Sequence, residues 1–182
     1  MSNTTVVAAS LQGMYRDMLQ DAAGGVRWDR GWQKNAIVTD CRRLLAGFMR
    51  GTPTALGIRG LQVGAGLATW DQPPGPPPPT AGQVALVDPH PFTVSVADLQ
   101  IDFLSLTTDS VSAVPTNRLQ IVATHRQGVP PWPDANHATS TLREFGLVGE
   151  LNGATVLINY VTHPAIVKDP TSTLERTIWL VF

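Results

Sequence analysis

The chain has 182 residues, of which 43% are hydrophobic and 15% charged, and its formal net charge is −1. This length is enough for one domain with a substantial core. The near-neutral charge, without a basic patch, argues against a nucleic-acid partner, and no apolar run is long enough to cross a membrane. The low charge content favours a surface that is partly buried against other proteins.

The cysteine content and the first residues indicate where the chain is made. Cys41 is the single cysteine, which excludes an intrachain disulfide framework. The opening residues, MSNTTVVAASLQGMYRDML, lack the basic n-region and long apolar h-region of a secretory signal. We therefore expect the chain to be made and folded in a cytoplasm.

A first helix is predicted over residues 6–23. Its apolar residues recur near the helical period and would share one face, namely Val7, Leu11, Met14 and Met18. The Gly24-Gly25 pair that follows is typical of a helix end.

A second helix is predicted over residues 36–50. Asn35 is placed to cap its N-terminus, while Gly51 suits the left-handed position after its end and Pro53 blocks continuation. One face carries the apolar residues Ile37, Cys41, Leu44, Leu45 and Phe48. We interpret Cys41 as a small core residue because it lies on that face.

The middle of the chain alternates strands with proline-rich loops. A strand over residues 56–63 contains two glycines, which predicts a bulge or a close backbone neighbour. Residues 72–82, QPPGPPPPTAG, predict a stiff surface loop. From residue 85 to 124 apolar and polar residues alternate as in strands, and residues 127–140 form a second irregular loop around Trp132.

The last forty residues predict a hairpin and a terminal strand. Asn152-Gly153 lies between two β-prone runs, and both residues accept the positive φ of a type I′ turn. The final run is apolar up to Phe182, so we expect the C-terminus to lie in a sheet. Its polar residues concentrate on one parity, which also holds a tryptophan: Thr173, Glu175, Thr177, Trp179 and Val181.

These elements predict an α+β fold. We expect one domain over residues 1–182, in which a helical segment, 1–52, packs on an antiparallel β-sandwich formed by residues 53–182, with residues 72–82 as a surface loop. Most of the sandwich would come from residues 56–64 and 84–182.

The sequence predicts no catalytic residues, no metal and no cofactor. None of the four histidines, His90, His125, His137 and His163, has a partner at the spacing of a helical zinc site. The chain also lacks a G-x-S-x-G elbow, an H-E-x-x-H motif and a P-loop. An enzyme would require His125, His137 and His163 to gather around a metal in space.

Two stretches together resemble small structural proteins of phage tails and of phage-derived contractile injection systems. The first is NAIVTDCRRLLAGFMRG with LGIRGLQVGAG, ending at Trp70-Asp71, and the second runs from STLREFGLVGE to the C-terminus. The resemblance implies a non-enzymatic subunit at the baseplate, tail tip or fibre attachment, assembled in the bacterial cytoplasm. In those proteins a late LRE-x-GL strand pairs with a hairpin and a terminal strand.

The tryptophans are the candidate interface residues. We expect a homo-oligomer, a trimer or a six-fold set, in contact with other tail proteins through Trp132, Trp70, Trp28 and Trp32. Trp132 lies between prolines, and an exposed tryptophan in such a loop would anchor a neighbouring subunit. The alternative is a carbohydrate-binding β-sandwich module in which Trp28, Trp32, Trp70 and Trp132 stack on sugars.

Overall fold

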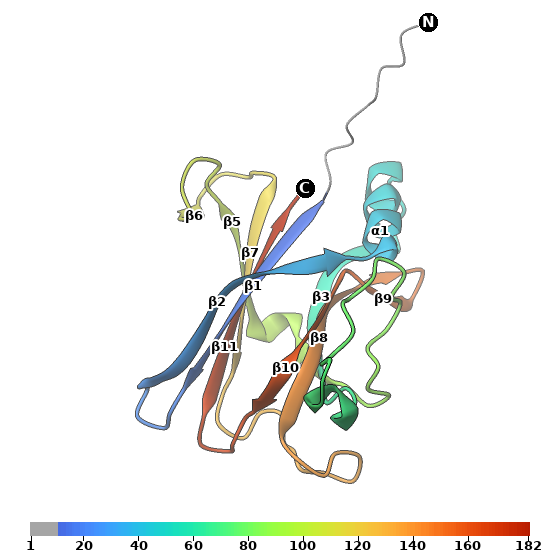
Figure 1. Ribbon diagram of the computed structural model, residues 1–182. Helices are drawn as coiled ribbons and strands as arrows, with labels where there is room; N and C mark the ends of the chain where they lie inside the picture. The colour runs from blue at the N-terminus through green and yellow to red at the C-terminus, as the bar shows by residue number, and fades with distance from the viewer. Residues whose placement is uncertain (1–10) are drawn as a thin grey trace, which may run out of the picture.

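The protein is mostly β in a computed structural model that describes residues 11–182. One 11-stranded antiparallel sheet curls into a half-barrel, and a short helix, α1 (Thr39–Arg50), stands beside one end of it (Figure 1). The strand order is β4-β3-β8-β10-β2-β1-β11-β7-β5-β6, with β9 paired to β8. The strands are β1 (Gln12–Gln20), β2 (Val26–Ile37), β3 (Ala55–Gly64), β4 (Phe92–Ser95), β5 (Leu99–Leu104), β6 (Val111–Ser112), β7 (Arg118–His125), β8 (Thr141–Leu151), β9 (Ala154–Leu157), β10 (Asn159–Val167) and β11 (Thr173–Val181).

The predicted α+β sandwich with two N-terminal helices is wrong. Two stacked sheets are not formed, because β2 and β1 join the two groups of strands into one continuous sheet. The core instead fills the concave inner face of that sheet. It includes the fully buried side chains of Leu61, Ile121, Phe145, Leu147 and Ile178.

The first predicted helix, residues 6–23, is a strand where the structure describes it, since residues 12–20 form β1. The part of this prediction over residues 6–10 lies outside the described residues. Met14 and Met18 are four apart, and this spacing places two residues on one face of a strand as well as of a helix. The inner face of β1 carries Asp17 among its buried residues, so the period-two pattern was not apparent in the sequence.

The second predicted helix is confirmed over most of its length, but its start is wrong. Residues 36 and 37 belong to β2 and pair with β10. Asn35 lies in the same strand and caps nothing; the N-cap is Val38, without a side-chain bond. Gly51 has the predicted positive φ, 75°, and Cys41 is buried. Within residues 11–182, no helix is long and apolar enough to cross a membrane.

Several predictions for the middle of the chain are confirmed. The strand β3 contains the expected irregularity, a register shift against β8 between Leu56 and Gly60. Residues 72–82 and 127–140 contain neither helix nor strand. The first of these loops runs from a 3₁₀ turn, η1 (Ala68–Asp71), towards β4, and the Thr162 hydroxyl donates to the carbonyl oxygen of Pro77 at 2.7 Å.

The C-terminal predictions are confirmed except for one pairing. Asn152 and Gly153 join β8 to β9 with φ values of 54° and 78°. The terminal strand β11 lies inside the sheet, between β1 and β7. It does not lie beside the LREFGL strand, β8, whose neighbours are β3, β10 and β9.

We expect Gly153→Val to lower the free energy of unfolding by about 1 to 3 kcal/mol, because a β-branched residue is strained at this positive φ. Chemical denaturation would measure the loss. Gly82→Val is the matched control, since Gly82 also has open space around it and needs no positive φ. Equal stability of the two variants would contradict the turn assignment.

Candidate functional site

Trp132 is buried in the protein's own fold, at 5% exposure, so the expectation of an exposed loop tryptophan is wrong. Its ring stacks on His137 with centroids 3.8 Å apart. His137 is itself held by two carboxylates, with Nδ1 2.8 Å from Asp134 Oδ1 and Nε2 3.0 Å from Asp88 Oδ2. These bonds fix the loop against the body of the protein.

Trp70 is also buried, at 8% exposure. It lies in η1, directly before Asp71, whose carboxylate receives two hydrogen bonds from the Arg143 guanidinium at 2.8 and 2.6 Å. The indole packs so closely on Gly66 that a Cβ atom there would lie 2.5 Å from it. Trp70 therefore anchors the start of the proline-rich loop.

Trp28 and Trp32 lie on opposite faces of the sheet, although a regular strand would place residues four apart on one face. The cause is a bulge in β2, where Trp32 pairs with Arg16 but Asp29 pairs with Met18, so that β2 has one extra residue. Gly31 occupies the bulge with φ of 66°. Trp28 packs on the core, whereas Trp32 lies on the outer, convex face.

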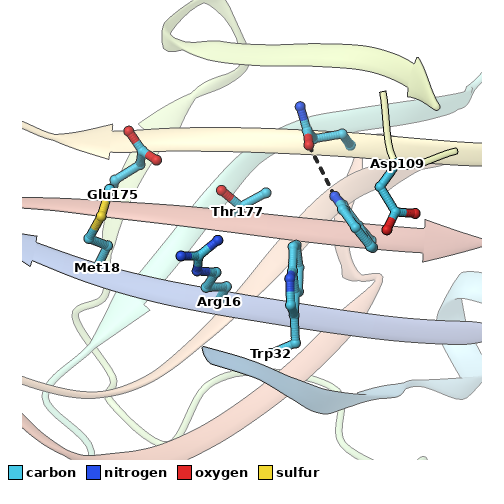
Figure 2. Close-up of a pocket in the computed structure, with 8 residues that line it drawn as sticks. Arg16, Met18, Trp32, Asp109, Glu175 and Thr177 are labelled. Carbon is cyan, nitrogen blue, oxygen red and sulfur yellow. Dashed lines mark hydrogen bonds between the residues drawn. The ribbon is translucent and has the colours of Figure 1, made fainter. Parts of the chain in front are cut away.

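A hollow on that outer face, which we call the outer groove, has a volume of about 360 Å³. Its lining comes from β2, β1, β11 and β7 and from the loop after β5 (Figure 2). The strict alternation of β11 turns Glu175, Thr177 and Trp179 to this face and buries the residues between them. The full lining is Arg16, Met18, Trp32, Asp109, Gln120, Glu175, Thr177 and Trp179.

Two tryptophans meet across β1 to form one wall of the outer groove. The centroids of Trp32 and Trp179 are 3.9 Å apart, with the rings tilted by 35°. Trp179 also donates from Nε1 to Gln120 at 3.0 Å, and the Arg118 guanidinium lies 5.5 Å from its ring centroid. Trp179 is thus engaged by three neighbours, whereas in Figure 2 one side of Trp32 is turned towards Arg16 and Thr177.

Some polar side chains of the outer groove form hydrogen bonds or ion pairs within the protein, and others do not. Arg16 binds Asp29 through Nε and Nη2, and this bond, together with the backbone N–H of Gly31, lowers the pKa of Asp29 to about 2. Among the described residues, the side chains of Glu175 and Thr177 make no hydrogen bond, nor does Nη1 of Arg16. The groove therefore offers an acceptor (Glu175), a hydroxyl (Thr177) and a donor (Arg16) side by side, and we call these three side chains the polar row.

A second hollow, which we call the apolar mouth, opens on the inner face at the end of the half-barrel beside α1. It holds about 330 Å³ and is lined almost entirely by apolar side chains. They include Leu45, Phe48, Ile58, Ile101, Leu119 and Phe182. Phe48, Ile101 and Phe182 are 43%, 37% and 39% exposed.

Two pairs of buried ionisable groups bond to each other and line neither hollow. Arg176 and Asp17 form a fully buried pair, and the Tyr160 hydroxyl donates to the buried carboxylate of Glu144 at 2.5 Å. His125 and His163 lie near Arg176, but His137 belongs to the separate cluster with Asp88. Over residues 11–182, no three histidine, cysteine or acidic side chains are placed to hold a metal.

Comparison with known proteins found no matching family model, no similar curated protein and no similar solved structure.

Proposed function

We propose that the chain is a non-enzymatic structural subunit of a phage tail or contractile injection particle, at the baseplate, tail tip or fibre attachment. In this proposal it assembles as a homo-oligomer and contacts neighbouring tail proteins. The support from sequence is the resemblance of residues 35–71 and 140–182 to such subunits.

The apolar mouth is the observation that carries the proposal. Large exposed apolar side chains gathered around one hollow mark a protein–protein interface more often than a free surface. Met49, which follows Phe48 in α1, is 90% exposed. The hollow has almost no polar groups to orient a small ligand, so a neighbouring copy of the chain that inserts apolar side chains is the occupant we propose.

The buried ionisable groups support the same function. Asp88, His137 and Asp134 fix one loop, and Glu144 accepts from the backbone N–H groups of residues 87 and 88 at 3.0 and 2.7 Å. A structural subunit needs such rigid connections between loops and sheet. It does not need a titrating group aimed into a cleft.

The location in a particle can be tested on purified native particles. An epitope tag at the N-terminus, chosen because Phe182 at the C-terminus lines the proposed contact, would be detected with gold-labelled antibody in negative-stain images, with mass spectrometry of the same particles as a second readout. We expect labelling at one end of the tail. Absence of the chain from assembled particles would refute the proposal.

We expect Phe48→Glu and Ile101→Glu each to weaken self-association by about 2 kcal/mol or more, which is roughly 30-fold, because a charge would enter a desolvated contact. Light scattering over a concentration series would measure the change. Leu106→Glu is the control, since Leu106 is 66% exposed and does not line the mouth. A wild-type chain that stays monomeric at high concentration would contradict the proposed contact.

A further inference from the structure

We infer that the outer groove is a binding site for a neutral glycan, with Trp32 as the platform for one pyranose ring. This site lies on the opposite face of the sheet from the apolar mouth. The inference therefore does not depend on the proposed assembly contact.

The position of Trp32 suits stacking on a sugar. Apolar C–H groups on one face of a pyranose pack on an indole, and aromatic side chains combine a large rigid surface with low ordering cost. Trp179 supports Trp32 from one side at 3.9 Å and is itself held by its bond to Gln120. The platform is consequently in place before a ligand arrives, and its other side faces the polar row of the groove (Figure 2).

The polar row provides the hydrogen bonds that sugar hydroxyls require. Thr177 pairs with Arg16, and Glu175 with Met18, across the β1–β11 ladder, so these side chains project side by side from the outer face. The carboxylate of Glu175 can accept, Nη1 of Arg16 can donate and the Thr177 hydroxyl can do both. Asp29 already orients the Arg16 guanidinium through two of its nitrogens.

Charge selects a neutral ligand over an anionic one. Each of the two arginines at the groove is paired with an aspartate, Arg16 with Asp29 and Arg118 with Asp109. Glu175 has no such partner among the described residues, so its carboxylate is the uncompensated charge in the groove lining. The exposed Lys34 lies on the same face beside Trp32 but does not line the groove. A sialylated or phosphorylated glycan would be repelled, whereas the hydroxyls of a neutral glycan can donate to the free carboxylate.

The groove has the size and lining of a site for part of a saccharide. Its volume of about 360 Å³ falls in the range of roughly 300–1,000 Å³ that small-molecule sites occupy. It is an open hollow on a broad sheet face, so a longer chain could extend along the strands on either side. We therefore expect oligosaccharides to bind better than monosaccharides.

The test is titration of the full-length protein with lactose, cellohexaose, maltohexaose, xylohexaose and N,N′-acetylated chitohexaose, followed by NMR of the indole N–H groups. We expect at least one probe to shift the Trp32 and Trp179 signals saturably at millimolar concentration. The sialylated form of a bound lactose-type probe should bind several-fold more weakly.

Variants of the lining residues then show whether the probe binds in the outer groove. Trp32→Ala should weaken the bound probe at least tenfold, and Thr177→Val and Glu175→Gln several-fold each, without loss of the folded spectrum. Thr173→Val is the matched control, because Thr173 lies on the same face of β11 outside the groove. The inference is overturned if no neutral probe shifts either indole, or if binding survives in both Trp32→Ala and Thr177→Val.

Discussion

Replacing Arg176 with methionine is expected to lower the free energy of unfolding by about 3–5 kcal/mol, the largest effect of any single change considered for this protein. Arg176 donates to Asp17 from Nε at 2.7 Å and from Nη2 at 2.8 Å, and both side chains are 0% exposed. Methionine would leave the Asp17 carboxylate buried without a partner. The carboxylate would then be protonated or hydrated, and either change destabilises the folded state.

The pKa of Asp17 indicates how strongly this pair interacts. Burial alone would raise the pKa of the carboxyl, but the charge and hydrogen bonds of Arg176 outweigh burial and hold the pKa below its ordinary value. The guanidinium also lies 3.6 Å from the ring centroid of Phe145. Loss of Arg176 therefore removes a packing contact with an aromatic core residue as well as an ion pair.

Two further variants separate the stability lost through the unpaired Asp17 charge from the stability lost through the missing contacts of Arg176. The double variant Asp17→Leu/Arg176→Met should recover much of the stability, because replacing a whole buried pair by apolar groups is often nearly neutral. Arg27→Met removes an exposed pair with Asp169 and should cost no more than about 1 kcal/mol. Denaturant unfolding of the two single variants and the double variant would rank their free energies of unfolding. An Arg176→Met variant as stable as Arg27→Met would contradict the expected order.

Buried charges hid β1 from the sequence analysis, but they did not hide β8 or β11, whose β-prone runs were recognised as strands although Glu144 and Arg176 are buried in them. β7 was predicted correctly from the alternation of Leu119, Ile121 and Ala123 with Gln120 and Thr124, although the buried His125 lies on the same face. β1 places Asp17 on its inner face, and its partner Arg176 follows 159 residues later, so neither charge could be recognised as buried. Because β1 was predicted as a helix, the junction in which β2 and β1 connect the two groups of strands could not be foreseen.

The candidate site was predictable only in part. Trp32 was singled out, and the parity of the last run placed Trp179 with Glu175 and Thr177. What joins these residues is the bulge at Gly31, which turns Trp32 to the outer face and leaves Trp28 on the inner one. No strand was predicted around Gly31, so the bulge there could not be foreseen. The burial of Trp132 similarly depends on a bond between His137 and Asp88, 49 residues apart.

Acidification is the second change with a large expected effect, because two histidines are buried in uncharged form. Burial, together with the charges of Arg176 and Lys168, lowers the pKa of His125 to about 3. Burial and the nearby Arg176 likewise lower the pKa of His163 to about 3. Nδ1 of His163 lies 2.9 Å from the Pro164 carbonyl oxygen and must carry the proton there, so Nε2 faces Nη2 of Arg176 at 3.3 Å as an acceptor.

The direction of the pH effect follows from these values. In the unfolded chain both histidines titrate near their ordinary pKa of 6.5. Between about pH 6.5 and 3 the unfolded state therefore binds more protons than the folded state, and the free energy of unfolding falls as the pH falls. Each histidine contributes at most about 1.4 kcal/mol per pH unit in this window. Asp17 adds to the loss only below about pH 4, since its folded pKa is the lowered one.

We expect the free energy of unfolding to fall by roughly 4 kcal/mol between pH 7 and pH 5, measured by denaturant unfolding at constant ionic strength. His125→Leu should reduce this fall by about half. It should not lower stability at pH 7, because both nitrogens of His125 are buried without a hydrogen-bond partner and leucine removes two unsatisfied groups. If His125→Leu retains the wild-type fall between pH 7 and pH 5, the buried neutral state of His125 is not what makes the fold sensitive to acid.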